Sequence, residues 1–354
     1  MTAEISFTTQ ATHMKNDHLL SVKDLRTYIR GEQKTIHAVD GVSFVVKPGE
    51  TVCLVGESGS GKSVTCASLT GIIPQPPAEI VDGSIIFNGE SLLDADEAAL
   101  RQIRGNRIAH VFQNPQTALD PVYTVGEQVV EAMTIHRDIP AQAARRRTVE
   151  LFKRVGIPRA SATVDSYPHE FSSGQRQRIA IAIALAANPD LLIADEPTTA
   201  VDVTVQARLI ELLRELTDGG MSLLCVTHDL RVVSALADRV LVMFGGTIVE
   251  RGPTKELFTQ PSHPYTQALF ESYSGLSRRS NRSTRTKIPT NGCRFRAECS
   301  HAIEECAKDE QPPFYTVAGC QDHCTSCVHY GSEGDPGPII ANAHEAQPKG
   351  GTDD

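Results

Sequence analysis

The sequence predicts an α/β domain over about residues 19–255, and its hydrophobic pattern is the main reason. Short apolar runs at Thr51–Val55, Leu191–Ala194 and Leu223–Thr227 are typical of strands buried on both faces of a sheet. Helix-compatible stretches separate these runs, and this alternation is the pattern of an α/β fold. The segment Arg239–Arg251, RVLVMFGGTIVER, predicts two further strands joined by a Gly-Gly turn.

The bulk properties are those of an ordinary globular chain of 354 residues, 40% hydrophobic and 22% charged. This length fits one large domain plus an appendage. The net charge of -9 argues against nonspecific binding to nucleic acid, which needs clustered Lys and Arg. We interpret the one basic stretch, Arg278–Lys287, as a solvated linker rather than an RNA- or lipid-binding patch.

The distribution of apolar residues bears on where the chain resides. No apolar run approaches the about 18 residues that a membrane-spanning helix needs, and the longest candidate, Ile179–Ala187, predicts a buried helix face. The N-terminal residues 1–18 are polar and lack the apolar stretch of a secretory signal. We therefore expect the chain to stay in the cytoplasm, where its nine cysteines are thiols or metal ligands rather than disulfides.

A glycine-rich loop follows the first buried run and predicts a phosphate site. The sequence GESGSGKS matches the GxxxxGK[ST] pattern between an apolar strand and a helix-compatible run. Its residues are Gly56, Glu57, Ser58, Gly59, Ser60, Gly61, Lys62 and Ser63. Glycines let backbone N–H groups surround an anion, and the helix that follows adds a favourable dipole. We expect Lys62 to reach the β- and γ-phosphates of ATP and the Ser63 hydroxyl to bind Mg²⁺, because the strand, loop and helix together make a chance match improbable.

Polar residues at the ends of other predicted strands complete this site. Asp195 and Glu196 end an apolar run, so Asp195 is expected to hold Mg²⁺ and Glu196 to act as the general base on water. His228 directly follows the run LLCVT, at a strand end where α/β sites gather, and is expected to contact the γ-phosphate. Gln113 follows another strand-like run and is expected to touch Mg²⁺ or the attacking water.

Taken in order, these motifs resemble the ABC ATPase family over about residues 19–270. Phe171–Gln175, FSSGQ, followed by RQRIAIAIAL looks like the signature loop and helix of that family, and Ala200-Val-Asp202 looks like its D-loop. The resemblance implies a P-loop, RecA-like α/β core with an antiparallel β subdomain and a helical subdomain. It also implies that two such domains meet head to tail, so that the signature residues of one complete the ATP site of the other. The residues this assigns to nucleotide binding are Ser172, Ser173, Gly174, Gln175 and Asp202.

Two positions within this resemblance carry alternatives. Ser173 stands where the family usually has glycine, and a Cβ close to phosphate is expected to weaken the composite site without abolishing it. Tyr28 lies where the family has an aromatic platform for adenine, and the other interpretation of Tyr28 is simple strand packing.

Four further segments resemble the ATPases of oligopeptide/dipeptide importers: GESGSGKSVT, NPQTALDPVYTVGEQ, DEPTTAVDVTVQ and HPYTQAL. This resemblance implies an ATP-hydrolysing subunit that energises peptide import, peripheral on the cytoplasmic face of the membrane. It implies a second, similar ATPase, two membrane-spanning permeases that contact the surface near Gln113 and Val125–Val155, and an external substrate-binding protein. Nickel or another small solute is the alternative cargo. A soluble ABC ATPase acting on DNA or ribosomes is a different class, which the single P-loop and the lack of heptads disfavour. A third alternative is a regulatory or redox-sensing ATPase that uses the cysteine tail.

The cysteines are concentrated near the end of the chain, six of them between Cys293 and Cys327. The pattern from Cys293 through Cys299 to Cys306 resembles the C-terminal motif of the same subfamily, where it is associated with a [4Fe–4S] cluster. Thiolates at this spacing suit a [4Fe–4S] cluster or Zn²⁺, and unliganded thiols are the third possibility. The expected ligands are Cys293, Cys299, Cys306 and Cys327, the last chosen over Cys320 and Cys324.

The predicted organisation therefore has five parts. A flexible N-terminus (1–18) precedes the ATPase domain (19–270), a linker (271–290), a Cys-rich extension (291–330) and a disordered, Gly-, Pro- and acid-rich tail (331–354). The extension is poor in apolar residues, so we expect the cluster to staple it rather than to take part in catalysis.

Overall fold

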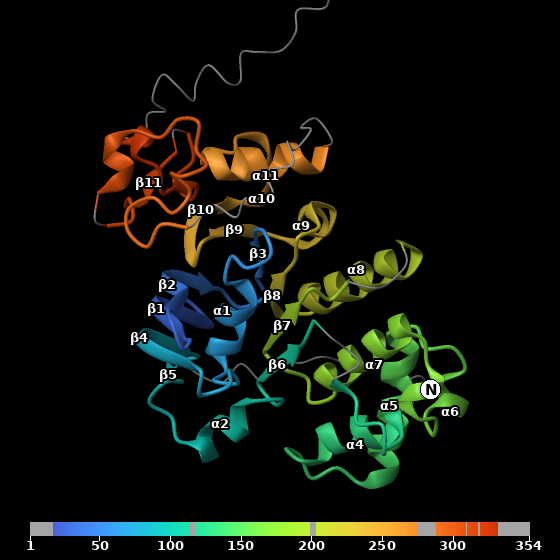
Figure 1. Ribbon diagram of the computed structural model, residues 1–354. Helices are drawn as coiled ribbons and strands as arrows, with labels where there is room; N and C mark the ends of the chain where they lie inside the picture. The colour runs from blue at the N-terminus through green and yellow to red at the C-terminus, as the bar shows by residue number, and fades with distance from the viewer. Residues whose placement is uncertain are drawn as a thin grey trace, which may run out of the picture.

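The computed structural model describes residues 17–113, 118–198, 203–274, 288–308, 310–317 and 319–331. The structure has a central sheet, with an antiparallel sheet on one side of it and a group of helices on the other (Figure 1). Most of the predicted linker, the tail beyond Gly331 and the first 16 residues lie outside the described residues, so those domain boundaries remain predictions.

The central sheet has eight strands in the order β11-β12-β10-β9-β3-β8-β7-β6. The five strands from β9 to the β6 edge, in the order β9, β3, β8, β7 and β6, run parallel to one another. Their bounds are Thr51–Val55 (β3), Ile108–Val111 (β6), Leu191–Asp195 (β7), Ser222–Val226 (β8) and Arg239–Phe244 (β9). Every residue of β3, β7 and β8 is buried, which explains why these strands appear in the sequence as unbroken apolar runs.

The sheet continues beyond β9 in antiparallel strands. β10 (Thr247–Pro253) returns from β9 through Gly245 and Gly246, as the Gly-Gly turn predicts. Two short strands from the C-terminal segment follow, β12 (Cys324–Thr325) on β10 and β11 (Tyr315–Thr316) on β12. The C-terminal segment is therefore built onto the edge of the central sheet, at the top of Figure 1.

A second, four-stranded antiparallel sheet covers one side of the core. Its order is β2-β1-β4-β5, with β1 at Leu20–Arg30, β2 at Thr35–Val46, β4 at Ala78–Phe87 and β5 at Glu90–Ser91. Its apolar side chains pack with those of β3, β7 and β8 in one buried cluster that includes Leu20, Phe44 and Phe87. Helix α1 (Lys62–Leu69) packs between the two sheets, and α2 (Glu97–Ile103) leads from β5 to β6.

A group of helices lies between β6 and β7 in the sequence and forms its own layer (Figure 1). It comprises α4 (Val125–Thr134), α5 (Ala141–Arg154), α6 (Ala160–Thr163), a 3₁₀ turn (Pro168–Glu170) and α7 (Ser173–Leu185). Thr124 starts α4 with a capping box in which its hydroxyl accepts from Glu127 N–H and the Glu127 carboxylate accepts from Thr124 N–H. The buried positions of α4, α5 and α7 pack together in the second core cluster, around Val129, Phe152 and Ile179.

The remaining helices follow strands β7, β8 and β10 along the chain. They are α8 (Val203–Asp218), α9 (Leu230–Leu236), α10 (Thr254–Thr259) and α11 (Pro264–Ser274), with short 3₁₀ turns at Glu304–Ala307 and Val328–Tyr330. Throughout the described residues, no helix has the length and apolar character needed to cross a membrane.

Candidate nucleotide site

The glycine-rich loop joins β3 to α1, as the sequence predicts, and two of its glycines admit no side chain. Gly56 has φ 153° and Gly61 has φ 107°, conformations that other residues rarely adopt. A Cβ on Gly56 would lie 2.2 Å from the Met243 carbonyl oxygen, and one on Gly61 would lie 2.2 Å from that of Ala38. The loop therefore keeps its shape because strands β9 and β2 press against its backbone.

Lys62 is held over this loop rather than extended into solvent. Its ammonium group donates to the carbonyl oxygens of Gly56 and Glu57, each at 2.8 Å, and its side chain is buried. Burial lowers the pKa of Lys62, while the nearby charges of Glu196 and Asp195 act in the opposite direction. The loop thus presents a cation at its opening, where the phosphates of ATP are expected.

Asp195, the last residue of β7, has the environment of a Mg²⁺ ligand. Burial raises the pKa of Asp195, although a hydrogen bond from the Ser63 side chain opposes that shift. Its Oδ1 atom is buried and has no hydrogen-bond partner, which is costly for a carboxylate unless a cation compensates. A hard cation with oxygen ligands fits this pair of side chains, and no other donor set is needed to explain the unpaired oxygen.

Three of the predicted polar residues meet at the ends of neighbouring strands. Gln113 follows β6, Glu196 follows β7 and His228 follows β8, and these strands are adjacent in the sheet. Gln113 Nε2 donates to Glu196 Oε2 at 3.1 Å, and His228 Nδ1 lies 3.0 Å from Glu196 Oε1. Both carboxylate oxygens are therefore oriented by a neighbour, an arrangement suited to a general base.

The backbone of Glu196 is itself unusual. Its φ of 50° is in the left-handed region, which a residue other than glycine adopts only when its surroundings enforce it. Its N–H donates to the Val226 carbonyl oxygen at 2.8 Å, so the β7–β8 pairing continues past the strand and holds the turn. This geometry points the side chain toward Gln113 and His228.

The signature segment forms the start of α7, in the helical layer and away from α1 (Figure 1). Ser172 is the N-cap, with Gln175 N–H donating to its hydroxyl at 3.3 Å and Ser172 N–H donating to Gln175 Oε1 at 2.9 Å. Ser173 and Gly174 are the first helical residues, and neither has a positive φ. The backbone therefore does not require glycine at Ser173, and the expected weakening of the site rests on its side chain alone. Asp202 of the predicted D-loop lies outside the described residues.

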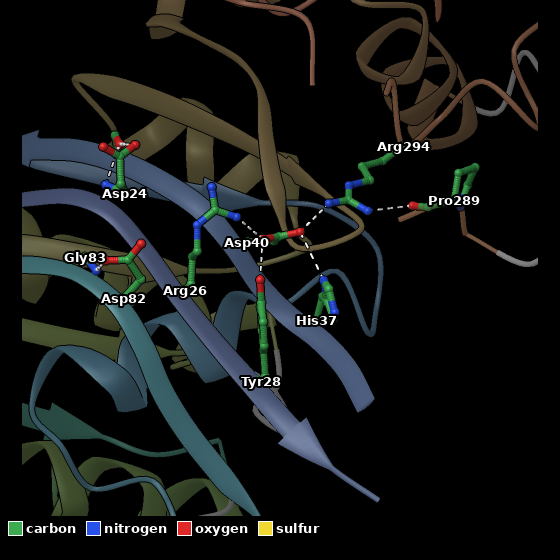
Figure 2. Close-up of polar contacts among 10 residues, drawn as sticks. Asp24, Arg26, Tyr28, His37, Asp40, Asp82, Gly83, Pro289 and Arg294 are labelled. Carbon is green, nitrogen blue, oxygen red and sulfur yellow. Dashed lines mark hydrogen bonds and ion pairs between the residues drawn. The ribbon is translucent and has the colours of Figure 1, made fainter. Parts of the chain in front are cut away.

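Tyr28 lies on β1 in a polar cluster that the sequence did not predict. Its ring stacks on His37, with ring centroids 4.0 Å apart, and its hydroxyl donates to Asp40 Oδ1 at 3.0 Å (Figure 2). Tyr28 is partly buried, and its role as adenine platform or as a packing residue of the strand stays a prediction.

A second contact that the sequence did not predict joins helix α11 to the phosphate loop. The Tyr265 hydroxyl in α11 accepts a hydrogen bond from Glu57 N–H at 2.9 Å. The Tyr265 ring packs against Phe244 at the end of β9 and Phe295 of the extension, with centroids 4.6 and 5.4 Å away. The HPYTQAL motif was visible in the sequence, but nothing in it indicated that its tyrosine reaches the loop.

The four cysteines that the sequence predicts as ligands lie together. One small pocket is lined by Cys293, Cys299, Cys306 and Cys327, whereas Cys320 and Cys324 do not line it. Burial raises the pKa of Cys293 to about 11 and that of Cys327 to about 12. Among the described residues, no group of three or more His, Cys, Asp or Glu side chains is arranged to hold a metal ion.

The comparisons with known proteins identify the family of the chain. Residues 39–199 match the ABC transporter family, and residues 249–306 match the C-terminal region of oligopeptide/dipeptide transporters. The chain is 27% identical to the ATP-binding cassette MJ0796, whose dimer was solved in a post-hydrolysis state with ADP and Pi. That match covers 66% of this chain and 98% of the other, with a TM-score of 0.61. The protein is thus an ATPase of the ATP-binding cassette class, for which ATP and Mg²⁺ are the expected ligands.

The relatives give the narrower group. The chain is 45% identical to a putative peptide import ATP-binding protein of Brucella ovis, over 90% of this chain and 98% of the other. It is 44% identical to the oligopeptide transport ATP-binding protein AppD of Bacillus subtilis, over 89% and 98% of the two chains. It belongs to the ATP-binding subunits of the oligopeptide/dipeptide transporter family.

Proposed function

We propose that this chain hydrolyses ATP to drive the import of peptides, as a peripheral subunit on the cytoplasmic face of a membrane transporter. The carrying observation is the meeting of Gln113, Glu196 and His228 at three adjacent strand ends, within electrostatic reach of Lys62. Its peptide cargo is supported by relatives named for peptide import that match over nearly their whole length.

The proposed chemistry assigns a role to each of these side chains. Lys62 and the loop N–H groups bind the phosphates, and Ser63 with Asp195 would hold Mg²⁺, which supplies charge neutralisation at the β- and γ-phosphates. Glu196 takes the proton of the attacking water, with its carboxylate oriented by Gln113. His228 is 54% exposed, so it is free to turn from Glu196 toward the γ-phosphate.

The second half of the site is proposed to come from another ATPase subunit. Ser172, Ser173, Gly174 and Gln175 lie at the start of α7, whose N-terminal N–H groups and dipole favour an anion. Because this helix start lies away from α1 in the same chain (Figure 1), the γ-phosphate it meets would be bound to a second, similar subunit. Asp202 is proposed to take part in that contact.

The surface between β6 and α4 is proposed to contact the two permease subunits. It carries exposed apolar side chains, Phe112 (46%), Val122 (73%), Tyr123 (55%) and Ile135 (68%). A hollow of about 460 Å³ opens beside Phe112 and Ile135. Exposed apolar groups around a concave surface are typical of docking sites, and Phe112, which lines this one, directly precedes Gln113 in the chain. Substrate specificity would then come from an external binding protein.

The cysteine pocket is proposed to hold a [4Fe–4S] cluster. Four thiols around one pocket, three of them buried and that of Cys299 half-buried, are the donor set that such a cluster requires. Arg296 also lines the pocket and would offset the negative charge of a thiolate-bound cluster.

The cluster is tested on protein purified without oxygen. Iron and acid-labile sulfide are measured in wild type, in Cys299→Ser and in the matched control Cys320→Ser, whose thiol lies outside the pocket. Four iron and four sulfide per chain in wild type and control, with loss in Cys299→Ser, is the expected result. Zinc in place of iron, or equal iron content in all three, would refute the cluster.

The transport function is tested by purifying the tagged chain from its native membranes in mild detergent, followed by mass spectrometry. We expect two membrane-spanning subunits and a second P-loop protein to copurify. The complex is then placed in liposomes, and peptide uptake is compared with nickel uptake for wild type and Glu196→Gln. Peptide uptake that Glu196→Gln abolishes supports the proposal. Uptake of nickel alone supports the alternative cargo, and recovery with ribosomes or DNA would overturn the transporter assignment.

A further inference from the structure

A buried carboxylate, Asp40 of β2, connects the antiparallel sheet to the C-terminal extension. Only 5% of its side chain is exposed, and it is surrounded by four polar side chains (Figure 2). These are Arg26 and Tyr28 of β1, His37 of β2, and Arg294 of the extension. Arg294 comes from a part of the chain 254 positions later, so Asp40 is a tertiary connection and not a local turn.

The two oxygens of Asp40 have different partners. Oδ1 accepts from the Tyr28 hydroxyl at 3.0 Å and from Arg26, whereas Oδ2 is bound by Arg294 and lies 3.3 Å from His37 Nδ1. Burial by itself would raise the pKa of Asp40, but the charge of Arg294 and the hydrogen bonds from Tyr28 and His37 outweigh it. The pKa of Asp40 therefore lies below its ordinary value, and the carboxylate stays ionised.

Arg294 is the most thoroughly buried cation in this cluster. Its side chain is 7% exposed, against 39% for Arg26, and its Nη1 donates to the Pro289 carbonyl oxygen at 2.8 Å (Figure 2). A buried carboxylate that loses its buried cation is strongly destabilised where it stands. The position of Asp40 therefore depends more on the extension than on the exposed Arg26.

Tyr28 in turn depends on Asp40 and His37 for its orientation. The hydroxyl contacts Asp40 and also Arg26, and one ring face is stacked on His37 with an interplanar angle of 12°. The β1–β2 pairing also shifts register between Thr27 and Tyr28, so the regular ladder does not set the direction of this side chain. The side-chain contacts therefore set it.

We propose that Asp40 and Arg294 are positioning residues for the adenine end of the nucleotide site, and that the C-terminal extension thereby sets the affinity for the base. This rests on the prediction from the family resemblance that Tyr28 is the adenine platform. Arg294 holds Asp40, Asp40 and His37 hold the Tyr28 ring, and the ring receives the base. The extension is then part of the ATP site although none of its residues touches the nucleotide.

The alternative is that Arg294 and Asp40 only attach the extension to the core. The two roles differ in what they do to a ligand that has no base. Inorganic tripolyphosphate with Mg²⁺ binds the phosphate loop but not an aromatic platform, so a positioning role affects ATP and spares tripolyphosphate. A purely structural role affects both ligands equally or neither.

The test measures the Kd of Mg²⁺–ATP and of Mg²⁺–tripolyphosphate by titration calorimetry on the full chain. The variants are Tyr28→Ala, Arg294→Gln and the conservative Arg294→Lys. The matched control is Arg239→Gln, which removes the cation of another partly buried pair, Arg239 with Glu50 at 2.9 Å. We expect Arg294→Gln to weaken ATP binding about fivefold with tripolyphosphate binding unchanged, Arg294→Lys to restore part of the loss, and the control to change neither.

Each outcome separates the inference from the assignment on which it rests. If Tyr28→Ala weakens ATP binding but Arg294→Gln does not, the platform stands and the positioning role is wrong. If Arg294→Gln weakens both ligands to the same degree, its role is structural and the inference is again wrong. If Tyr28→Ala leaves ATP binding unchanged, Tyr28 is not the platform and both fail.

Discussion

Replacing Glu250 by Gln should detach the C-terminal extension from the ATPase core while leaving the shape of the side chain almost unchanged. Glu250 on β10 is fully buried, and its carboxylate accepts three hydrogen bonds. Oε1 accepts from Ser262 N–H at 2.7 Å and is 2.7 Å from His323 Nε2, and Oε2 accepts from His263 N–H at 2.9 Å. This one carboxylate therefore joins the central sheet, the start of α11 and the extension.

The magnitude follows from these three bonds. A glutamine has one acceptor oxygen, so whichever way it turns, at least one buried donor faces an amide NH₂ and loses its partner. An unsatisfied buried donor costs about 1–3 kcal/mol, and the remaining bonds lose the strength that a charged acceptor gives them. We expect the free energy of opening this region to fall by about 3 kcal/mol, which corresponds to roughly 100-fold faster amide exchange.

The assay is hydrogen exchange followed by mass spectrometry on peptides that contain Ser262, His263 and His323. The matched control is Glu79→Gln, since Glu79 pairs with Arg30 at 2.6 Å at the surface, with the two side chains 49% and 62% exposed. Exposed pairs contribute about 0–1 kcal/mol, so the control should change exchange little. Exchange in Glu250→Gln within threefold of wild type at Ser262 and His263 would refute this reasoning.

Two further predictions concern catalysis and pH. Glu196→Gln should slow ATP hydrolysis by about 10²–10⁴-fold while Mg²⁺–ATP binding persists, because only the general base is lost. Steady-state turnover and the calorimetric Kd of Mg²⁺–ATP measure the two effects, and an unchanged rate of hydrolysis contradicts the prediction. Burial lowers the pKa of His110 to about 4 from its ordinary 6.5, so between those values the unfolded chain binds the proton and stability falls as pH falls. His110→Phe should therefore reduce the loss of unfolding free energy between pH 7 and pH 5 by about 2 kcal/mol in urea titrations, and an identical loss in both proteins would contradict it.

The parts of the fold that the sequence predicts well are those in which local pattern and tertiary role coincide. The strands at Thr51–Val55, Leu191–Asp195 and Ser222–Val226 are buried on both faces, so they appear in the sequence as unbroken apolar runs. The phosphate loop is also predictable from the sequence, because the close approach of the Met243 and Ala38 carbonyl oxygens leaves no room for a side chain at Gly56 and Gly61.

The polar contacts between distant segments could not be predicted from the sequence, because these segments meet only after folding. Asp40 and Arg294 are ordinary charged residues in the sequence, and nothing in their local context links positions 254 apart. The same holds for Tyr265, whose hydroxyl meets Glu57 N–H across the end of the sheet. Strands β11 and β12 have two residues each, too short for any periodicity to indicate them. The predicted roles of Gln113, Glu196 and His228 needed only their strand ends, and the structure does bring these three side chains together.

The position of β12 beside β10 affects how readily the chain aggregates before it joins its complex. β12 pairs with β10 at Glu250 and Arg251, and without it this strand would be the open edge of the central sheet. An open edge offers unpaired N–H and C=O groups to any other extended chain, including a second copy of the same protein. The cysteine pocket lies in the segment that supplies β12, so a chain whose extension has not folded exposes that edge. Cells that cannot complete the extension should therefore accumulate this subunit as aggregates, even though its nucleotide-binding residues are intact.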